Sequence, residues 1–120
     1  MSFIPRDIRP DQIRQIQEDG LKWTVGRAYE HSPYYRNKLD SAGCRPQDIN
    51  SLDDLAKLPF TDKTDFLEDY PFPLRAAPMK EIVRIHGSSG TTGKRKILCY
   101  TAGDIDHWAN LFARCYELAG

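Results

Sequence analysis

The sequence predicts a mixed α/β protein, α+β in the isolated chain, and three observations support this class. Apolar residues recur at helical spacing over residues 1–80, which predicts a helical region. Near Glu81 the apolar period changes to two, which is typical of strands. A stretch over residues 87–96 contains three glycines, four hydroxyl residues and three cations, without an apolar side chain. Residues 81–120 are therefore predicted to form a strand–loop–strand–helix unit.

Two longer helices are expected in the first region. Asp11 can cap a helix that runs to about His31, and one face of it carries apolar residues at i, i+4, i+7 and i+8, namely Leu21, Val25, Ala28 and Tyr29. Pro33 then opens a second helix, because proline suits the first helical position. Gly43 is expected to end it as the residue after the C-cap.

Two shorter helices are expected next. The stretch 51–54, Ser-Leu-Asp-Asp, offers a start similar to a capping box for a helix through Leu58. Thr61 can cap another helix over about residues 62–68, which the prolines at 71 and 73 would stop.

The last third is predicted to hold strands over residues 81–86 and 96–100. A helix capped by residues 101–104 follows, with a face formed by Ile105, Trp108, Ala109, Phe112, Tyr116 and Ala119. Two strands alone are marginal in water. We therefore expect this unit to expose its sheet edges and its Trp108 face, and the chain to self-associate as a dimer or swapped oligomer.

The composition of residues 87–96 predicts a phosphate-binding loop. Glycine allows close backbone approach and positive φ, and successive N–H groups can form a concavity for an anion. Hydroxyl groups add donors, and lysine adds a compact charge. The candidate ATP phosphate ligands are Ser88, Ser89, Gly90, Thr91, Thr92, Gly93 and Lys94. On pattern alone, a flexible polar hairpin loop is an equally good interpretation.

This loop does not match the Walker A motif, which needs a glycine, four intervening residues and then Gly-Lys-Ser/Thr. Ser88 occupies the position of the first glycine, and Arg95 follows Lys94 where a magnesium-binding hydroxyl would stand. A strand is expected after the loop, whereas Walker A leads into a helix.

The stretch Ser88–Lys94 after a strand resembles instead the phosphate loop of adenylate-forming enzymes. From about Trp23 to Gly120 the chain resembles the N-terminal region of phenylacetate–CoA ligases, most clearly at residues 33–43, 51–63, 70–72, 84–87 and 100–101. It departs from the family at Arg95, where a proline is usual; arginine gives up a fixed φ and adds a guanidinium that can fork onto phosphate.

The resemblance implies a ligase that converts ATP, an aryl-acetic acid and coenzyme A into acyl-CoA, AMP and diphosphate through an acyl-adenylate. It implies ATP with Mg²⁺, although no catalytic residue and no metal ligand can be assigned on this chain. Residues 1–120 would be one N-terminal fragment, inactive alone, without the remaining catalytic domain and the C-terminal domain. Two alternatives stay open: a non-catalytic helical interaction module over residues 1–80, and a coenzyme F390 synthetase or capsule-biosynthesis relative with the same fold.

Charge, hydropathy and cysteine content argue against several other classes of function. Seventeen basic and 17 acidic residues give no global field for nucleic acid or an anionic membrane. No apolar run reaches the roughly 18 residues of a membrane helix, and the N-terminus does not resemble a signal peptide. Cys44, Cys99 and Cys115 fit neither a disulfide framework nor a metal box, so we expect small buried hydrophobes and a cytoplasmic location.

Several single residues have a chemical and a structural interpretation. His86 is a ligand contact or, as we favour, an edge histidine satisfied by backbone. Lys63 steers anions or, as we favour, is a solvated lysine in a first helical turn. Packing is favoured over a recognition strip for the aromatic residues Trp23, Tyr29, Tyr34, Tyr35, Trp108, Phe112 and Tyr116.

Overall fold

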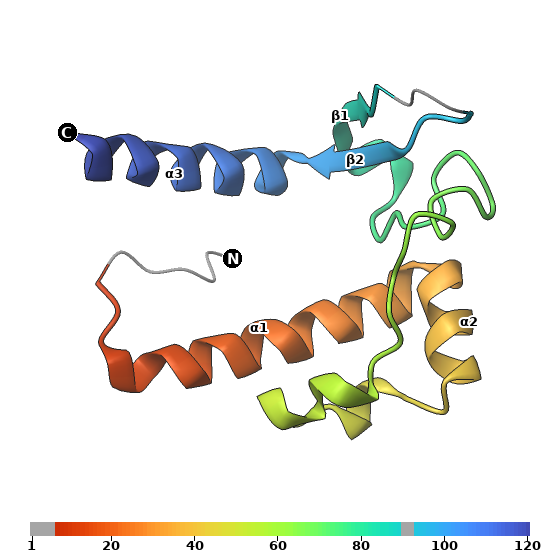
Figure 1. Ribbon diagram of the computed structural model, residues 1–120, viewed down its shortest axis with the longest axis horizontal. Coiled ribbons are helices and arrows are strands. Elements are labelled where there is room, and N and C mark those ends of the chain that lie inside the picture. Colours follow the sequence, from red (N-terminus) through yellow and green to blue (C-terminus); the bar gives the residue numbers. More distant parts are fainter. Residues whose placement is uncertain (1–6, 90–92) are drawn as a thin grey trace.

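The chain has two halves joined by one long connection (Figure 1). The computed structural model describes residues 7–89 and 93–120. The elements, with η for a 3₁₀ helix, are α1 Pro10–His31, α2 Pro33–Ser41, η1 Pro46–Asp48, η2 Leu52–Lys57, η3 Met79–Glu81, β1 Ile82–Gly87, β2 Ile97–Thr101 and α3 Ala102–Ala119. Helices plus a two-stranded antiparallel sheet form the predicted α+β fold.

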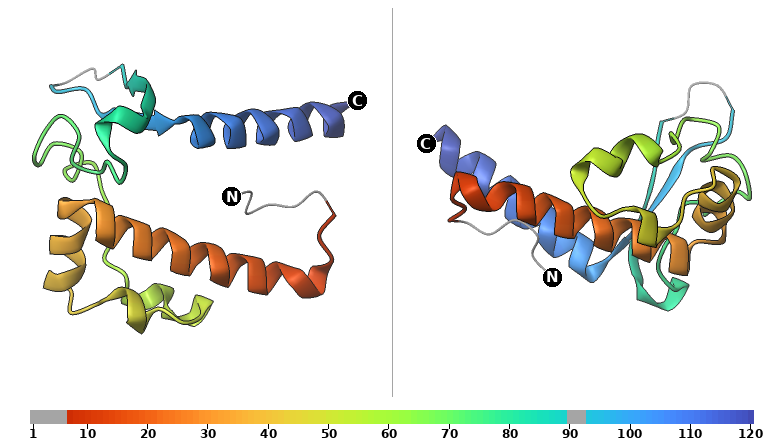
Figure 2. Two further views of the ribbon diagram at one scale, coloured as in Figure 1. Left: turned by 180° about the vertical axis from the view of Figure 1, so that it is seen from behind. Right: turned by 90° about the horizontal axis from the view of Figure 1, so that it is seen from below.

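The first half, from α1 to η2, holds the buried core. Val25 of α1 packs with residues from α2 and the turns after it, Leu39, Cys44 and Ile49. Leu21, Tyr29 and Leu58 cover this cluster. Figures 1 and 2 show α2 lying across the end of α1, which closes the core on one side. The predicted apolar face of α1 is thereby confirmed.

The ends of the two longer helices follow their local chemistry. Arg9, one residue before Pro10, is the N-cap of α1, and its N–H donates to Gln12 Oε1 at 3.2 Å. The predicted cap, Asp11, lies in the first turn instead. At α2, Ser32 Oγ accepts from the Tyr35 N–H at 3.3 Å, and Gly43 ends the helix with φ +66°, as predicted.

The prediction of a helix over residues 62–68 is wrong, because that segment consists of turns. Asp62 Oδ1 accepts from both the N–H and the hydroxyl of Thr64 at 2.7 Å. The Asp62 N–H donates to Asp65 Oδ2 at 2.5 Å. Such side-chain bonds compete with the helical ladder, which explains the difference. The predicted helix after Ser51 exists, but as the 3₁₀ helix η2.

The second half follows the prediction to within about one residue. β1 and β2 pair antiparallel, with Gly87 opposite Ile97 and His86 opposite Leu98. At Thr101, Asp104 Oδ2 accepts from the N–H and the hydroxyl at 2.8 Å, so the predicted cap of α3 is confirmed. Every described residue of β1, β2 and α3 keeps some solvent exposure.

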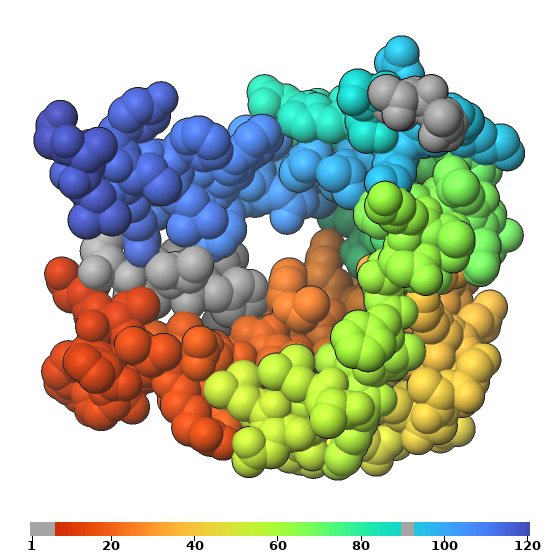
Figure 3. All heavy atoms as spheres, in the orientation of Figure 1, coloured from red at the N-terminus to blue at the C-terminus, as the bar shows by residue number. Residues whose placement is uncertain are grey.

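The two halves leave a hollow between α1 and α3, visible in the space-filling view (Figure 3). Trp23 and Arg27 of α1, Arg75 from the connection and Cys99 of β2 line a cavity of about 530 Å³ there. Within the described ranges, no helix combines the length and apolar character that a bilayer crossing requires.

Candidate functional site

The neck of the predicted phosphate loop is closed by one residue pair. The Ser88 N–H donates to the Lys96 carbonyl at 3.0 Å, and the Lys96 N–H donates to Ser88 Oγ at 3.1 Å. This pair continues the ladder one step beyond Gly87 and Ile97. Ser88 therefore has a structural task at the neck, and its hydroxyl hydrogen can still be donated to a ligand.

The described loop residues beyond the neck are exposed. Ser89 and Lys94 are both accessible to solvent. Gly93 adopts φ +99°, a conformation that a residue with a Cβ reaches only with strain. Three of the predicted ligands, Gly90, Thr91 and Thr92, lie outside the described residues. For the other four, the structure gives a closed neck, a glycine turn and an accessible lysine on one loop.

Lys94 contacts a part of the chain that precedes the strands. Its Nζ lies 5.1 Å from the centre of the Tyr70 ring, the distance of a cation–π contact. Tyr70 is 38% exposed. Sequence reasoning noted Tyr-Pro-Phe at residues 70–72 as part of the resemblance, but did not connect it with the loop.

The segment that carries Tyr70 is attached to α2 through Asp65. This carboxylate is only 5% exposed, accepts from Lys38 Nζ at 2.5 Å, and also accepts from the Tyr34 hydroxyl. The Lys38 and Tyr34 hydrogen bonds lower the pKa of Asp65 to about 2. Burial and the bond to Asp65 raise the pKa of Tyr34 to about 12. Lys63 in this segment is solvated, as expected, but it lies in a turn.

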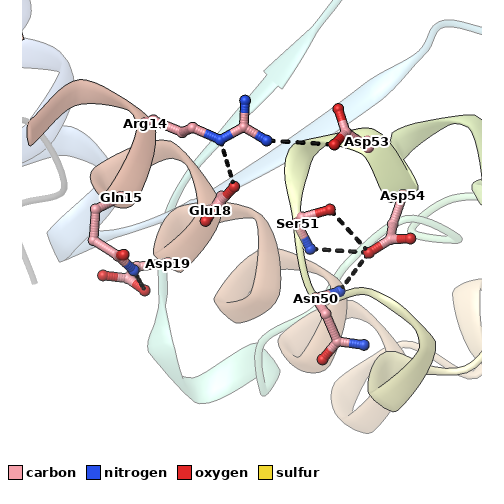
Figure 4. A network of polar contacts seen from close by, with 8 residues as sticks. All are labelled: Arg14, Gln15, Glu18, Asp19, Asn50, Ser51, Asp53 and Asp54. Carbon is pink, nitrogen blue, oxygen red and sulfur yellow. Dashed lines mark hydrogen bonds and ion pairs between the residues drawn. The ribbon is translucent and has the colours of Figure 1, made fainter. Parts of the chain in front are cut away.

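A second polar network joins α1 to η2 (Figure 4). Asp54 Oδ2 accepts from the Ser51 N–H at 2.9 Å and the Asn50 N–H at 2.8 Å, while Arg14 bridges Glu18 and Asp53. A bond from Lys57, followed by these backbone bonds, holds the pKa of Asp54 well below its usual range.

The carboxylates at the starts of η2 and α3 have structural roles. Asp54 and Asp104 are the third residues of capping boxes whose N-caps are Ser51 and Thr101, whereas Asp53 forms an ion pair with Arg14. In the described part of the chain, no three His, Cys, Asp or Glu residues are grouped so that they could hold a metal ion.

His86 of β1 is part of an aromatic cluster with Tyr100 of β2 and Trp108 of α3. Its ring lies 4.8 Å from that of Tyr100 and 5.7 Å from that of Trp108. Trp108 in turn contacts Phe112 at 5.8 Å. Packing is thus confirmed for Trp108, whereas Phe112 keeps a ring contact but is 52% exposed. For Tyr116, which is 74% exposed, the prediction of half-buried packing is wrong. The structure places His86 against rings, where we had expected a backbone partner.

The three cysteines differ more in solvent exposure than predicted. Cys44 is buried in the helical core, Cys99 is half-buried in β2, and Cys115 is exposed on α3. Burial raises the pKa of the Cys44 thiol and of the Cys99 thiol. The expectation of a buried hydrophobe is therefore confirmed for Cys44 and wrong for Cys115.

Known proteins resemble this chain over nearly its whole length, although no family model matches it. The phenylacetate–CoA ligase of Escherichia coli K12 is 50% identical over 110 residues, which cover 92% of this chain and 25% of that enzyme. The enzyme of Aromatoleum evansii is 45% identical over 97% of this chain and 28% of its own length. The Thermus thermophilus enzyme is 44% identical over 100% of this chain and 26% of its own length.

Solved structures point to the same kind of enzyme. A 2-hydroxyisobutyryl-CoA ligase with 2-HIB-AMP and CoA, in the thioesterification state, superimposes with a TM-score of 0.79 at 31% identity, over 89% of this chain and 24% of that one. The open conformation of that ligase superimposes with a TM-score of 0.76 at 27% identity. The chain thus spans about a quarter of the length of the relatives it matches. It is 44–50% identical to four phenylacetate–CoA ligases over 92–100% of its own length, so it is similar in sequence to a part of each of these enzymes.

Proposed function

We propose that this chain is the N-terminal, ATP phosphate-binding part of an AMP-forming ligase that joins an aryl-acetic acid to coenzyme A. One observation carries the proposal above the others. A glycine- and hydroxyl-rich loop, closed at its neck by Ser88 and Lys96, lies within a sequence up to 50% identical to phenylacetate–CoA ligases.

The proposed reaction has two steps. The carboxylate oxygen of the acid attacks the α-phosphorus of ATP, the bond to the bridging oxygen breaks, and diphosphate leaves with the bonding electrons. The sulfur of coenzyme A then attacks the carbonyl carbon of the acyl-adenylate. AMP leaves as the thioester forms, and the thiol proton passes to a base or to water.

The loop would act in the first of these steps. Ser88, Ser89, Gly90, Thr91, Thr92, Gly93 and Lys94 are proposed to hold the β- and γ-phosphates. Backbone N–H groups, hydroxyls and the Lys94 ammonium group would spread the charge of the departing diphosphate. Transfer at phosphorus depends mainly on such positioning and electrostatic stabilisation. The exposure of Lys94 supports this role, since its ammonium group is accessible to a ligand.

A magnesium ion would accompany ATP and neutralise part of the charge on its phosphates. Asp53 is engaged in an ion pair and Asp104 in the cap of α3, and the acidic residues of the described ranges form no cluster suited to a metal. We therefore propose no magnesium ligand on this chain.

The acid substrate is proposed from the relatives. The chain is 44–50% identical to phenylacetate–CoA ligases but only 26–31% identical to the 2-hydroxyisobutyryl-CoA ligase structures. This difference favours an aryl-acetic acid over a short hydroxy acid. Self-association through the exposed α3 face is proposed on separate grounds, because Trp108, Phe112 and Tyr116 leave apolar rings in contact with solvent.

The proposal is tested by Lys94→Ala in a full-length ligase that carries this segment. Adenylate formation should slow by about a hundredfold, because a phosphate ligand is lost, whereas thioester formation from supplied acyl-adenylate should be unchanged. Each step is measured separately by single-turnover kinetics. Lys80→Ala, an exposed lysine of η3, is the matched control and should alter neither step. Equal loss in both steps for Lys94→Ala would contradict the role.

A further inference from the structure

Tyr70 is the aromatic partner of the loop lysine. The Lys94 ammonium group lies 5.1 Å from the centre of the Tyr70 ring. Among the ion pairs of the described residues, none involves Lys94. An aromatic ring therefore takes the place that a carboxylate would often take beside an exposed lysine.

This partner belongs to a segment that is fixed independently of the loop. Asp65, five residues earlier, is almost fully buried and accepts hydrogen bonds from Tyr34 and Lys38 of α2. Farther along, the Ser32 hydroxyl donates to the Pro73 carbonyl at 3.3 Å. Both anchors connect the segment around Tyr70 to the helical half, which contains the core.

The type of partner determines what Lys94 can still do. A carboxylate would neutralise the ammonium charge and occupy its donors, whereas an aromatic ring attracts the cation through its quadrupole and leaves the net charge unchanged. Lysine has a flexible stem and loses considerable rotamer entropy when a ligand fixes it. A ring that already restricts the stem reduces this loss without competing electrostatically with phosphate.

We propose that Tyr70 is a positioning residue that orients Lys94 for a polyphosphate ligand, an inference that rests on the proposed function of the loop. Tyr70 acts through Lys94 and does not bind the phosphate itself. The aromatic face carries the effect, so phenylalanine should replace tyrosine and leucine should not. Replacement by leucine should weaken polyphosphate binding by about two- to fivefold, as expected for an exposed cation–π contact.

The first experiment tests the contact in the ligand-free 120-residue chain by NMR. The Lys94 Cε protons should be shifted upfield by the Tyr70 ring current. Tyr70→Phe should retain this shift and Tyr70→Leu should abolish it. Tyr116→Leu, at a tyrosine that is 74% exposed on α3, is the control and should leave it unchanged. Absence of an upfield shift in the unmodified chain, or its persistence in Tyr70→Leu, would overturn the proposal.

The second experiment measures the dissociation constant of inorganic tripolyphosphate at low ionic strength, where charge contacts are least screened. Tyr70→Leu should weaken binding and Tyr70→Phe should restore it. Unchanged or tighter binding in Tyr70→Leu, beside weaker binding in Lys94→Gln, would overturn the role of Tyr70 alone. If Lys94→Gln binds as well as the unmodified chain, or if the unmodified chain does not bind, the proposed function of the loop fails, and this inference fails with it.

Discussion

The helical half and the strand–helix half differ in how far they bury their apolar side chains. In the first half, Val25, Leu39 and Ile49 are at most 6% exposed and form one cluster. In the second half, Val83 and Ile85 of β1 are 62% and 50% exposed, although they have strong strand preference. Equally apolar sequences thus form a core in one region and an open surface in the other.

This difference shows which part of the chain can support the other. The helical half contains its own core and holds the connection through Asp65 and Ser32. The strand–helix half carries the candidate loop, but its sheet has only two strands, which are marginal alone. The loop therefore depends on contacts with other regions, and Tyr70 provides one such contact from the connection.

The largest effect on stability is expected from a pair of matched isoleucine substitutions. Ile49→Ala removes a side chain that is 1% exposed and should lower the free energy of unfolding by about 3 kcal/mol. Ile85→Ala, at a residue that is 50% exposed, should cost about 1 kcal/mol or less. Urea denaturation followed by circular dichroism measures both. Similar losses for the two variants would mean that the strand–helix half is packed as tightly as the helical half.

The next largest effect is expected on the free energy of unfolding at low pH, through Asp65. Because the pKa of folded Asp65 is about 2, below the ordinary value of 3.8, its ionised form stabilises the fold above pH 4. This contribution is lost as the pH falls from about 4 towards 2. Asp65→Asn should flatten the fall in stability over this window, after allowance for Asp54, whose pKa is also lowered. An Asp65→Asn variant that lost stability with acid as steeply as the unmodified chain would contradict the assignment.

A smaller effect is expected at the start of α3. Thr101→Ala removes the hydroxyl that accepts from the Asp104 N–H, and should cost about 1 kcal/mol. Thr101→Ser keeps the hydroxyl and is the matched control. Thermal unfolding measures both variants. Equal stability of the two would show that the cap contributes little to the stability of the fold.

The smallest effect on folding, but a visible one on assembly, is expected at Tyr116. Because Tyr116 is 74% exposed, Tyr116→Ser should change the free energy of unfolding by no more than about 0.5 kcal/mol. It should nevertheless reduce self-association, because it shortens the apolar face of α3. Light scattering over a concentration series measures the change. A strictly monomeric unmodified chain at high concentration would contradict the proposed self-association.

Sequence patterns located the elements wherever a single local preference dominated. The spacing of Leu21, Val25 and Tyr29 predicted the buried face of α1, and Thr101 with Asp104 predicted the cap of α3. Residues 62–68 were misassigned, because hydrogen bonds that the Asp62 and Asp65 carboxylates accept replace the helical ladder with turns. Local patterns do not show which of these two sets of bonds will form.

The candidate site was predictable in composition but not in its contacts. Glycine, serine and lysine at 88–94 indicated a phosphate loop, and the glycine at 93 does adopt positive φ. The neck bond between Ser88 and Lys96 follows from the strand register, which the sequence pattern did not predict. The contact between Tyr70 and Lys94 joins residues 24 positions apart through the fold of the connection, so no local pattern contains it.

The most direct test of the phosphate role is an NMR titration of the 120-residue chain with ATP-Mg and, in parallel, with AMP-Mg. If the loop binds the β- and γ-phosphates, the amide signals of Gly90 and Gly93 should shift with ATP and much less with AMP, and Lys94→Gln should reduce the ATP response. Equal shifts with the two nucleotides, or shifts confined to residues outside 88–96, would contradict the account.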